Sequence, residues 1–191
     1  ITKKIETNNK KINIIYVSTV EPYKNHSNLI LAIRKIKNKN FKINLNLIGG
    51  VHPKLKNDFF EIIKQKNPKN LNINYLGYMS YEKIQRYYKQ NDIGVFASSC
   101  ENMPNILIEM MSSKLPIACS NMGPMREILK DGGIYFNPFN LKSIISCILK
   151  LVKNRSLRNN LSLKAFKYSN KFSWNQCSKD TFDYLYTIAK Q

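Results

Sequence analysis

Short runs of β-branched and other apolar residues alternate along this chain with segments of helical periodicity, and this alternation limits the possible folds. The apolar runs predict buried strands over residues 12–18, 43–48, 73–76, 92–97, 116–119 and 134–136. Helical spacing and turn signals predict helices over 29–36, 59–66, 81–89, 106–114, 124–129, 141–153, 157–168 and 174–190. Strands that alternate with helices build parallel βαβ units. The sequence therefore predicts an α/β fold with a doubly wound parallel sheet.

The length of 191 residues suits one domain with a substantial core. Residues 1–11 are polar and rich in lysine, so we expect a linker or leading arm there and the folded domain over 12–191. No apolar run approaches the roughly 18 residues needed to cross a bilayer, and no signal-peptide pattern is visible. The first residue is Ile1 and not Met, which suggests a fragment or a processed chain.

The net charge is +19, from 31 basic and 12 acidic residues. One interpretation is attraction to phosphate, on a nucleotide, a nucleic acid or an anionic membrane. The other is compositional, because Lys, Asn and Ile are used heavily throughout, as in proteins encoded by A/T-rich genomes. No nucleic-acid-binding motif is present, so a nucleic acid is the least favoured partner.

The cysteines and histidines argue against several kinds of chemistry. Four scattered cysteines form no C-x-x-C pair, which fits a cytoplasmic protein and gives no support to a zinc site. A lone histidine is usually a surface or helix-capping residue, and the two here, His26 and His52, are far apart in the sequence. We therefore expect no metal site and no hydrolytic triad.

Two carboxylates, Glu101 and Glu109, stand eight positions apart around a polar turn that leads from a predicted strand into a predicted helix. In open α/β sheets, ligands bind in the crevice at the carboxyl ends of the strands. A helix start also offers N–H groups and a positive dipole end that suit phosphate. Acids near helix starts are common without any function. The strand–helix–strand frame and the intervening turn 102–105 favour a binding site.

A second polar turn follows the first predicted strand and places Lys24 just before the first helix, where a cation and helix N–H groups converge on a phosphate. This turn has neither the P-loop nor the G-x-G-x-x-G pattern. Taken alone, Lys24 is more simply a surface lysine, and Gly49–Gly50 and Gly77–Met79 are more simply turns. The tyrosines at 75, 78, 81, 87 and 88 are interpreted as packing residues, and the aromatic residues of 172–186 as anchors of the last helix.

The segment from Glu101 to Glu109, E-N-M-P-N-I-L-I-E, resembles the E-x7-E motif of retaining GT-B glycosyltransferases of group 1, family 4. Residues 114–118, 120–129 and 133–138 are similar to the blocks that follow in this family, and 172–174 to the entry of its final helix. The resemblance runs from Ile12 to the C-terminus. It implies the Rossmann-like, nucleotide-sugar-binding C-terminal half of a GT-B fold.

This resemblance implies a role for each matching residue. Glu101 is expected to contact the hydroxyls of the transferred sugar and to stabilise its developing oxocarbenium ion, and Lys24 to stabilise the departing diphosphate. Glu109 is expected to hold the nucleotide ribose. Backbone N–H groups of Met103, Pro104, Asn105 and Ile106 are expected to meet the sugar or the diphosphate. The other expected donor contacts are Gly50, Tyr78, Met79 and Thr19, which stands where many members carry an arginine.

The implied function is transfer of a sugar, with retained configuration and without an essential metal or other cofactor, from a nucleotide diphosphate sugar. The expected acceptor is a glycan or a lipid-linked molecule in bacterial cell-surface polysaccharide synthesis. The N-terminal acceptor domain is missing from this chain, so we expect poor transfer by the chain alone. The alternative is a non-catalytic nucleotide-sugar-binding subunit of a split transferase. Peripheral contact with an anionic membrane at the cytoplasmic face is a further expectation.

Overall fold

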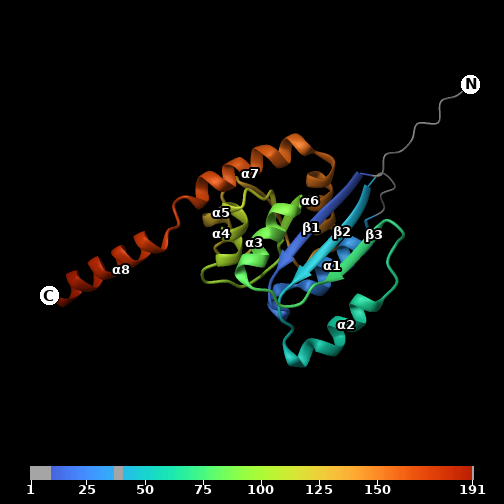
Figure 1. Cartoon of the computed structure of the whole chain (residues 1–191), viewed down its shortest axis with the longest axis horizontal. Helices are drawn as coiled ribbons and strands as arrows, with labels where there is room; N and C mark the ends of the chain where they lie inside the picture. Colours follow the sequence, from blue (N-terminus) through green and yellow to red (C-terminus); the bar gives the residue numbers. More distant parts are fainter. Residues whose placement is uncertain (1–9, 37–40, 191) are drawn as a thin grey trace, which may run out of the picture.

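The computed structural model describes residues 10–36 and 41–190, and these form a twisted parallel sheet with helices on both faces (Figure 1). The six strands of the described residues lie in the order β3-β2-β1-β4-β5-β6. They are β1 (Lys10–Val17), β2 (Phe41–Ile48), β3 (Leu71–Tyr75), β4 (Ile93–Phe96), β5 (Ile117–Ser120) and β6 (Gly133–Phe136). Every neighbouring pair is parallel. The predicted doubly wound α/β fold is confirmed.

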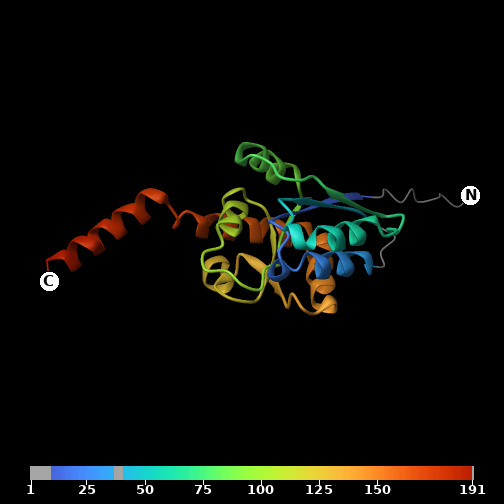
Figure 2. The same ribbon diagram turned by 90° about the horizontal axis from the view of Figure 1, so that it is seen from below.

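Eight α-helices and two 3-10 turns connect and follow the described strands. They are η1 (Pro22–Lys24), α1 (His26–Arg34), η2 (Pro53–Leu55), α2 (Lys56–Lys64), α3 (Tyr81–Gln90), α4 (Asn105–Ser112), α5 (Met125–Leu129), α6 (Leu141–Lys153), α7 (Arg155–Ser169) and α8 (Trp174–Ala189). Figure 2 shows α3 on one side of the sheet and α1 and α2 on the other. The 3-10 turns were not predicted.

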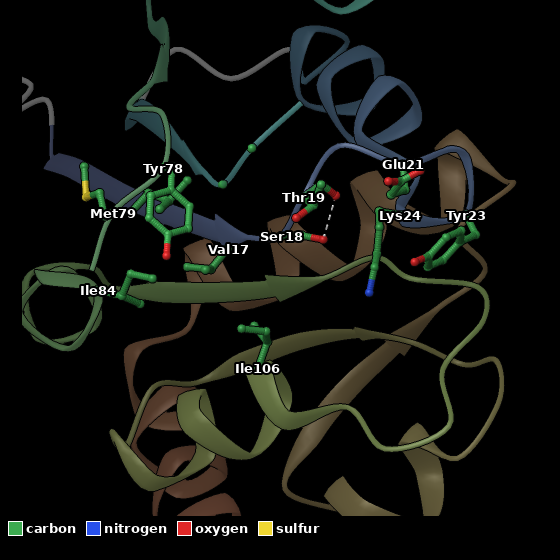
Figure 3. Close-up of a pocket in the computed structure, with 13 residues that line it drawn as sticks. Val17, Ser18, Thr19, Glu21, Tyr23, Lys24, Tyr78, Met79, Ile84 and Ile106 are labelled. Carbon is green, nitrogen blue, oxygen red and sulfur yellow. Dashed lines mark hydrogen bonds between the residues drawn. The ribbon is translucent and has the colours of Figure 1, made fainter. Parts of the chain in front are cut away.

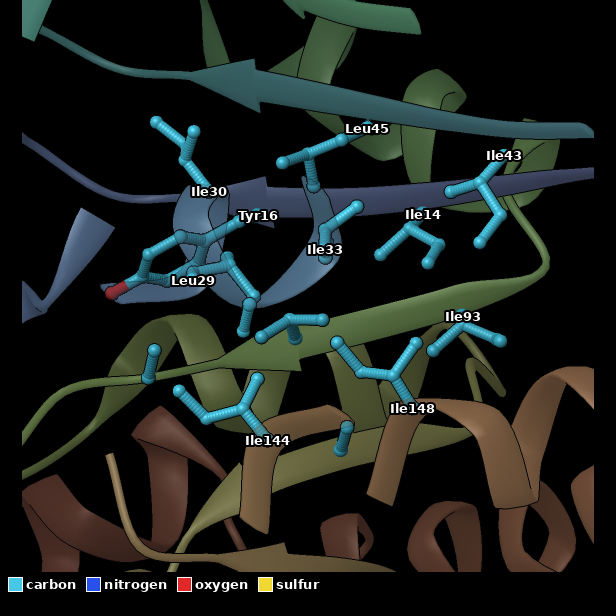
Figure 4. Close-up of a cluster of buried hydrophobic side chains, with 14 of the residues drawn as sticks. Ile14, Tyr16, Leu29, Ile30, Ile33, Ile43, Leu45, Ile93, Ile144 and Ile148 are labelled. Atoms are coloured by element: carbon cyan, nitrogen blue, oxygen red, sulfur yellow. The ribbon is translucent and has the colours of Figure 1, made fainter. Parts of the chain in front are cut away.

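Alternate residues of β1 pack into two separate cores, because successive side chains of a strand point to opposite faces. On one face, Ile14 and Tyr16 pack with α1 and α6 (Figure 4). On the other face, Ile15 and Val17 pack with side chains of α3, α4, α5 and α7. A strand buried on both faces explains why residues 12–17 read as a nearly continuous apolar run.

Several boundaries and two packing expectations differ from the sequence interpretation. Strand β1 takes in Lys10 and Lys11, the last residues of the predicted arm, and residues 1–9 lie outside the described part. Helices α1 and α2 each begin three residues earlier than predicted, at His26 and Lys56. Among the tyrosines, the packing interpretation fails for Tyr78 and Tyr81, whose exposed fractions are 85% and 59%.

The expected anchoring of the last helix by its aromatic residues is wrong for this chain. Every residue from 171 to 190 is exposed, including Trp174 at 80% and Phe182 at 69%. Helix α8 begins as predicted, with the Ser173 side chain accepting a hydrogen bond from the Gln176 N–H. It then projects away from the sheet (Figures 1 and 2). Over the described residues, no helix combines the length and the apolar character that crossing a membrane requires.

Candidate functional site

A cleft of about 420 Å³ lies at the carboxyl ends of β1 and β2. The strand order reverses between β1 and β4, and this switch point is where open α/β sheets bind ligands. Ile106, in the first turn of the helix after β4, reaches the same cleft (Figure 3). The lining residues are Val17, Ser18, Thr19, Glu21, Tyr23, Lys24, Ile48, Gly49, Gly50, Tyr78, Met79, Ile84 and Ile106.

The cleft has a polar end and a less polar end. Figure 3 shows Glu21, Tyr23 and Lys24 at one end, and Tyr78, Met79 and Ile84 at the other. Such a division suits an elongated ligand that carries charge at one end and a planar or apolar group at the other.

The loops after β1 and β2 are held together by hydrogen bonds that continue beyond the strands. Ser18 N–H donates to Ile48 O at 2.8 Å, and Val20 N–H donates to Gly50 O at 2.8 Å. Gly49 lies between them with φ +141°, and a Cβ atom there would stand 2.1 Å from Ser18 O. Only glycine fits this position. At Gly50 a Cβ would meet nothing within 4 Å, so the backbone there is open to a ligand.

Lys24 is held by a turn whose own backbone is fixed from two sides. The hydroxyl of Tyr16, a fully buried residue of β1, donates to Lys24 O at 2.7 Å. Asn25 adopts the left-handed conformation, with φ 54°, and its side-chain amide donates to Tyr23 O and to Ala97 O at 2.9 Å each. Asn25 therefore ties the lysine turn to the end of β4, just before the Glu101 segment.

The structure brings together Lys24 and Glu101, the two predicted catalytic residues. The Lys24 ammonium donates to Glu101 Oε1, and the two side chains are only 16% and 13% exposed. The ammonium also lies 5.0 Å from the Tyr23 ring centroid. Because this pair is partly buried, it is screened less than a surface pair. An anionic ligand in the cleft would compete with Glu101 for this cation.

Glu109 lies on α4, half-buried, and accepts a hydrogen bond from the Tyr88 hydroxyl at 3.3 Å. Burial raises the pKa of Glu109 above its usual value, and the hydrogen bond from Tyr88 opposes that shift. Burial is also the main reason that the pKa of Tyr88 is raised, with the Glu109 charge adding to it. Tyr88 thus stays a neutral donor that orients the carboxylate.

The structure places the predicted site residues in two groups. The described lining of the cleft includes Thr19, Lys24, Gly50, Tyr78, Met79 and Ile106. It does not include Glu101, Glu109, Met103, Pro104 or Asn105. Glu101 reaches the first group through Lys24. Met103 is 49% exposed on the turn and Pro104 is buried.

One part of the expected backbone contacts requires correction. Pro104 has no N–H, and the Asn105 N–H already donates to Met103 O at 2.9 Å. Leu107 N–H donates back to Pro104 O at 2.9 Å. Of the four expected groups, the N–H groups of Met103 and Ile106 are therefore left without an acceptor in the described part of the chain. Only Ile106 lines the cleft, at the N-terminal end of α4.

Sequence reasoning missed Glu21 and Tyr23 as cleft residues, although both belong to the turn that carries Lys24. Their position in that turn is the signal that could have identified them.

For the histidines, the sequence predicted a surface or capping role. His52 does accept a hydrogen bond from the Lys54 N–H at 3.2 Å. His26 instead is buried and stacks on Tyr16, with 4.6 Å between ring centroids. Within the described ranges, no group of three or more His, Cys, Asp or Glu side chains could hold a metal ion.

A comparison with protein-family models identifies the family. The family model for glycosyl transferases group 1 matches residues 1–168. O-antigen chain mannosyltransferase B from Escherichia coli is 25% identical over 169 residues, which are 88% of this chain and 44% of that protein. The chain spans less than half of the length of the curated relatives that it matches.

Two solved structures share the fold. HepE from Anabaena, in complex with UDP, matches with a TM-score of 0.81 and 16% identity over 95% of this chain and 50% of that chain. The C-terminal domain of the group 1 family glycosyl transferase LpcC from Francisella tularensis has a TM-score of 0.72 and 21% identity, over 85% of this chain and 86% of that one.

Proposed function

This chain belongs to the group 1 glycosyltransferases, and we propose that it is the C-terminal, donor-binding domain of a retaining GT-B enzyme of family 4. The observation that carries the proposal is a cleft lined by Lys24, by Ile106 in the first turn of α4 and by the open backbone at Gly50. A cation, a helix N-terminus and an uncovered backbone together suit a diphosphate. The solved relative HepE is bound to UDP.

We propose that the donor lies with its diphosphate at the polar end of the cleft and its base toward Tyr78 and Met79. Lys24 then leaves Glu101 for the diphosphate and stabilises the charge of the leaving group. Glu101, released from the ammonium, accepts hydrogen bonds from the sugar hydroxyls. Glu109 accepts hydrogen bonds from the ribose, held in place by Tyr88. The lysine and the helix dipole supply the leaving-group stabilisation, without an essential metal or cofactor.

We also propose an acceptor, a second domain and a location for the enzyme. The acceptor is a glycan or a lipid-linked molecule of bacterial cell-surface polysaccharide synthesis, as suggested by the O-antigen role named for the Escherichia coli relative. Its binding site belongs to an N-terminal domain that the 191 residues do not contain. The enzyme works in the cytoplasm, in peripheral contact with an anionic membrane.

A thermal-shift panel of nucleotide sugars tests the donor site. A ligand that binds only the folded state at about a hundred times its Kd stabilises that state by about 2.7 kcal/mol. We expect one nucleotide class to raise the Tm of the wild type, and Glu109→Ala to lose most of that shift. Glu127→Ala removes an exposed acid from the first turn of α5 and serves as the matched control. If no nucleotide sugar shifts the wild type, the donor-site proposal is wrong.

A further inference from the structure

Charge is distributed unequally between the two ends of the sheet. All six described strands are parallel, so the helices between them run back and end at the amino edge of the sheet, opposite the cleft (Figure 2). Exposed basic residues gather at that amino edge, and we call this set the basic edge: Lys11, Lys35, Lys42, Lys64, Lys66, Lys69, Lys89, Lys114, Lys130, Lys150, Lys153 and Arg155. The carboxyl edge also carries lysines, among them Lys24, Lys54, Lys56 and Lys142, but there they are accompanied by the acids Glu21, Asp58, Glu82, Glu101 and Glu127.

Helix dipoles explain only part of this pattern. Lysines in the last turns of α2, α3 and α6 complement the negative ends of those helices. Lys11 and Lys42, however, lie in strands, and they are register partners on the neighbouring strands β1 and β2. Like charges in directly paired positions destabilise a sheet. The chain thus tolerates an unfavourable pair of exposed cations at this edge.

The acids nearest to this edge are already engaged. Asp92, just before β4, accepts a hydrogen bond from the Asn13 N–H at 2.9 Å. Asp131, just before β6, pairs with Lys164 at 2.6 Å, and that ion pair lowers the pKa of the Asp131 carboxyl. Within the described residues, neither carboxylate forms an ion pair with Lys11 or Lys42.

We propose that the basic edge is the surface by which this domain binds an anionic lipid bilayer. Lysine provides compact point charges that suit a layer of phosphate head groups, and only Arg155 in the set is an arginine. Non-specific binding of single-stranded nucleic acid would use exposed aromatic rings for stacking. Among the described residues, the exposed rings of Tyr23, Tyr78, Tyr81 and Phe139 follow the carboxyl ends of strands. The exposed rings of residues 172–186 lie on or just before α8, which projects away from the sheet.

Binding through the basic edge leaves the cleft accessible. The cleft and the basic edge lie at opposite ends of the strands, so the cleft opens away from the lipid toward a water-soluble donor. This inference gives the membrane contact of the proposed function a defined surface. Vesicle binding does not depend on the donor site, so a failure here would leave the thermal-shift result untouched, and the reverse also holds.

Two triple variants of the 191-residue chain with equal net charge test the proposal. The edge variant is Lys11→Gln/Lys42→Gln/Lys89→Gln. The matched control is Lys54→Gln/Lys56→Gln/Lys142→Gln, which removes three exposed lysines from the opposite end. Vesicles of phosphatidylcholine, with and without phosphatidylglycerol, are used in co-sedimentation at low and high salt. Circular dichroism melts verify that both variants stay folded.

Each basic residue that reaches an anionic surface strengthens binding about fivefold. We expect the wild type to bind only the vesicles with phosphatidylglycerol, less so at high salt. The edge variant should bind at least about tenfold more weakly, and the control should stay near wild type. Equal losses in the two variants would overturn the proposal, because net charge alone would then explain binding. The proposal would also be overturned if the wild type does not bind vesicles but binds single-stranded RNA through the same lysines.

Discussion

At the scale of single residues, the two glycines after β2 have different tasks. Gly49→Ala places a Cβ against Ser18 O at a positive φ, so we expect a loss of about 3 kcal/mol or more in the free energy of unfolding, or no folded protein. Gly50→Ala meets nothing within 4 Å and should keep wild-type stability, while its methyl group obstructs the cleft and weakens donor binding. Urea unfolding and thermal shift with nucleotide separate the two effects. Equal stability of the two variants would contradict this assignment.

His26 makes stability depend on pH. Burial, and secondarily the nearby Lys24 charge, lower the pKa of His26 to about 3, against 6.5 for an exposed histidine. Between these values the unfolded chain binds a proton that the folded chain excludes. Above about pH 6.5, His26 therefore does not reduce the free energy of unfolding. Below this pH, exclusion of the proton lowers the free energy of unfolding by about 1.4 kcal/mol for each pH unit.

Urea unfolding at pH 7 and pH 5 measures this dependence on pH. His26→Phe is the control, because it keeps a ring against Tyr16 and Phe59 but cannot be protonated. The variant should lose about 2 kcal/mol less than the wild type between these two pH values. If the two proteins respond identically to acid, His26 is not the group responsible.

The sequence could predict which residues reach the cleft only where strand ends fixed their place. The turns of Lys24 and Gly50 follow that rule, whereas the family resemblance was needed to suggest Thr19, Tyr78, Met79 and Ile106. The ion pair of Lys24 with Glu101 could not be predicted, because it joins side chains 77 positions apart whose meeting depends on two loop conformations. The expected N–H contact of Pro104 was wrong, and the sequence alone excluded it, because proline has no N–H.

At the scale of elements, hydrophobic periodicity predicts that a helix has an apolar face but not what covers it. Helix α6 was predicted with its observed bounds and packs against the sheet. Helix α8 was predicted equally well in position, yet none of its residues is buried. The turn η1 was not predicted, because a three-residue 3-10 turn has no periodicity to detect.

Deleting residues 174–191 tests whether α8 contributes to the stability of this domain. The helix buries no side chain, so we expect the free energy of unfolding to change by less than about 0.5 kcal/mol. The exposed aromatic and aliphatic surface disappears with it, so self-association in size-exclusion chromatography should decrease. Leu161→Ala in α7 is the reference, because removing this buried side chain costs about 2–5 kcal/mol. A comparable loss on deletion would show that α8 packs on the domain in solution.

At the scale of the whole molecule, the alternation of strands and helices was enough to predict the architecture. The order β3-β2-β1-β4-β5-β6 was not predicted, because each buried strand looks alike in sequence and its neighbours are chosen by packing. The same order places the β1 and β4 loops side by side, and so it creates the cleft that Lys24 and Ile106 share. Function here depends on a property of the complete sheet, which no single segment reveals.

Because this chain matches less than half of the length of its curated relatives, we expect limited catalysis by these 191 residues alone. The chain corresponds to 44% of the Escherichia coli mannosyltransferase, and we expect donor binding without efficient transfer. Holding two reactants in productive geometry supplies about 7–11 kcal/mol of an enzyme's barrier reduction, and the proposed acceptor domain would supply that positioning. Nucleotide release from the donor, measured with the chain alone, should therefore stay near the rate without protein even when thermal shift reports binding.

The control variant Lys24→Ala should abolish the thermal shift and leave that background rate unchanged. Rapid release by the wild-type chain that disappears in Lys24→Ala would show instead that these residues form a complete active site.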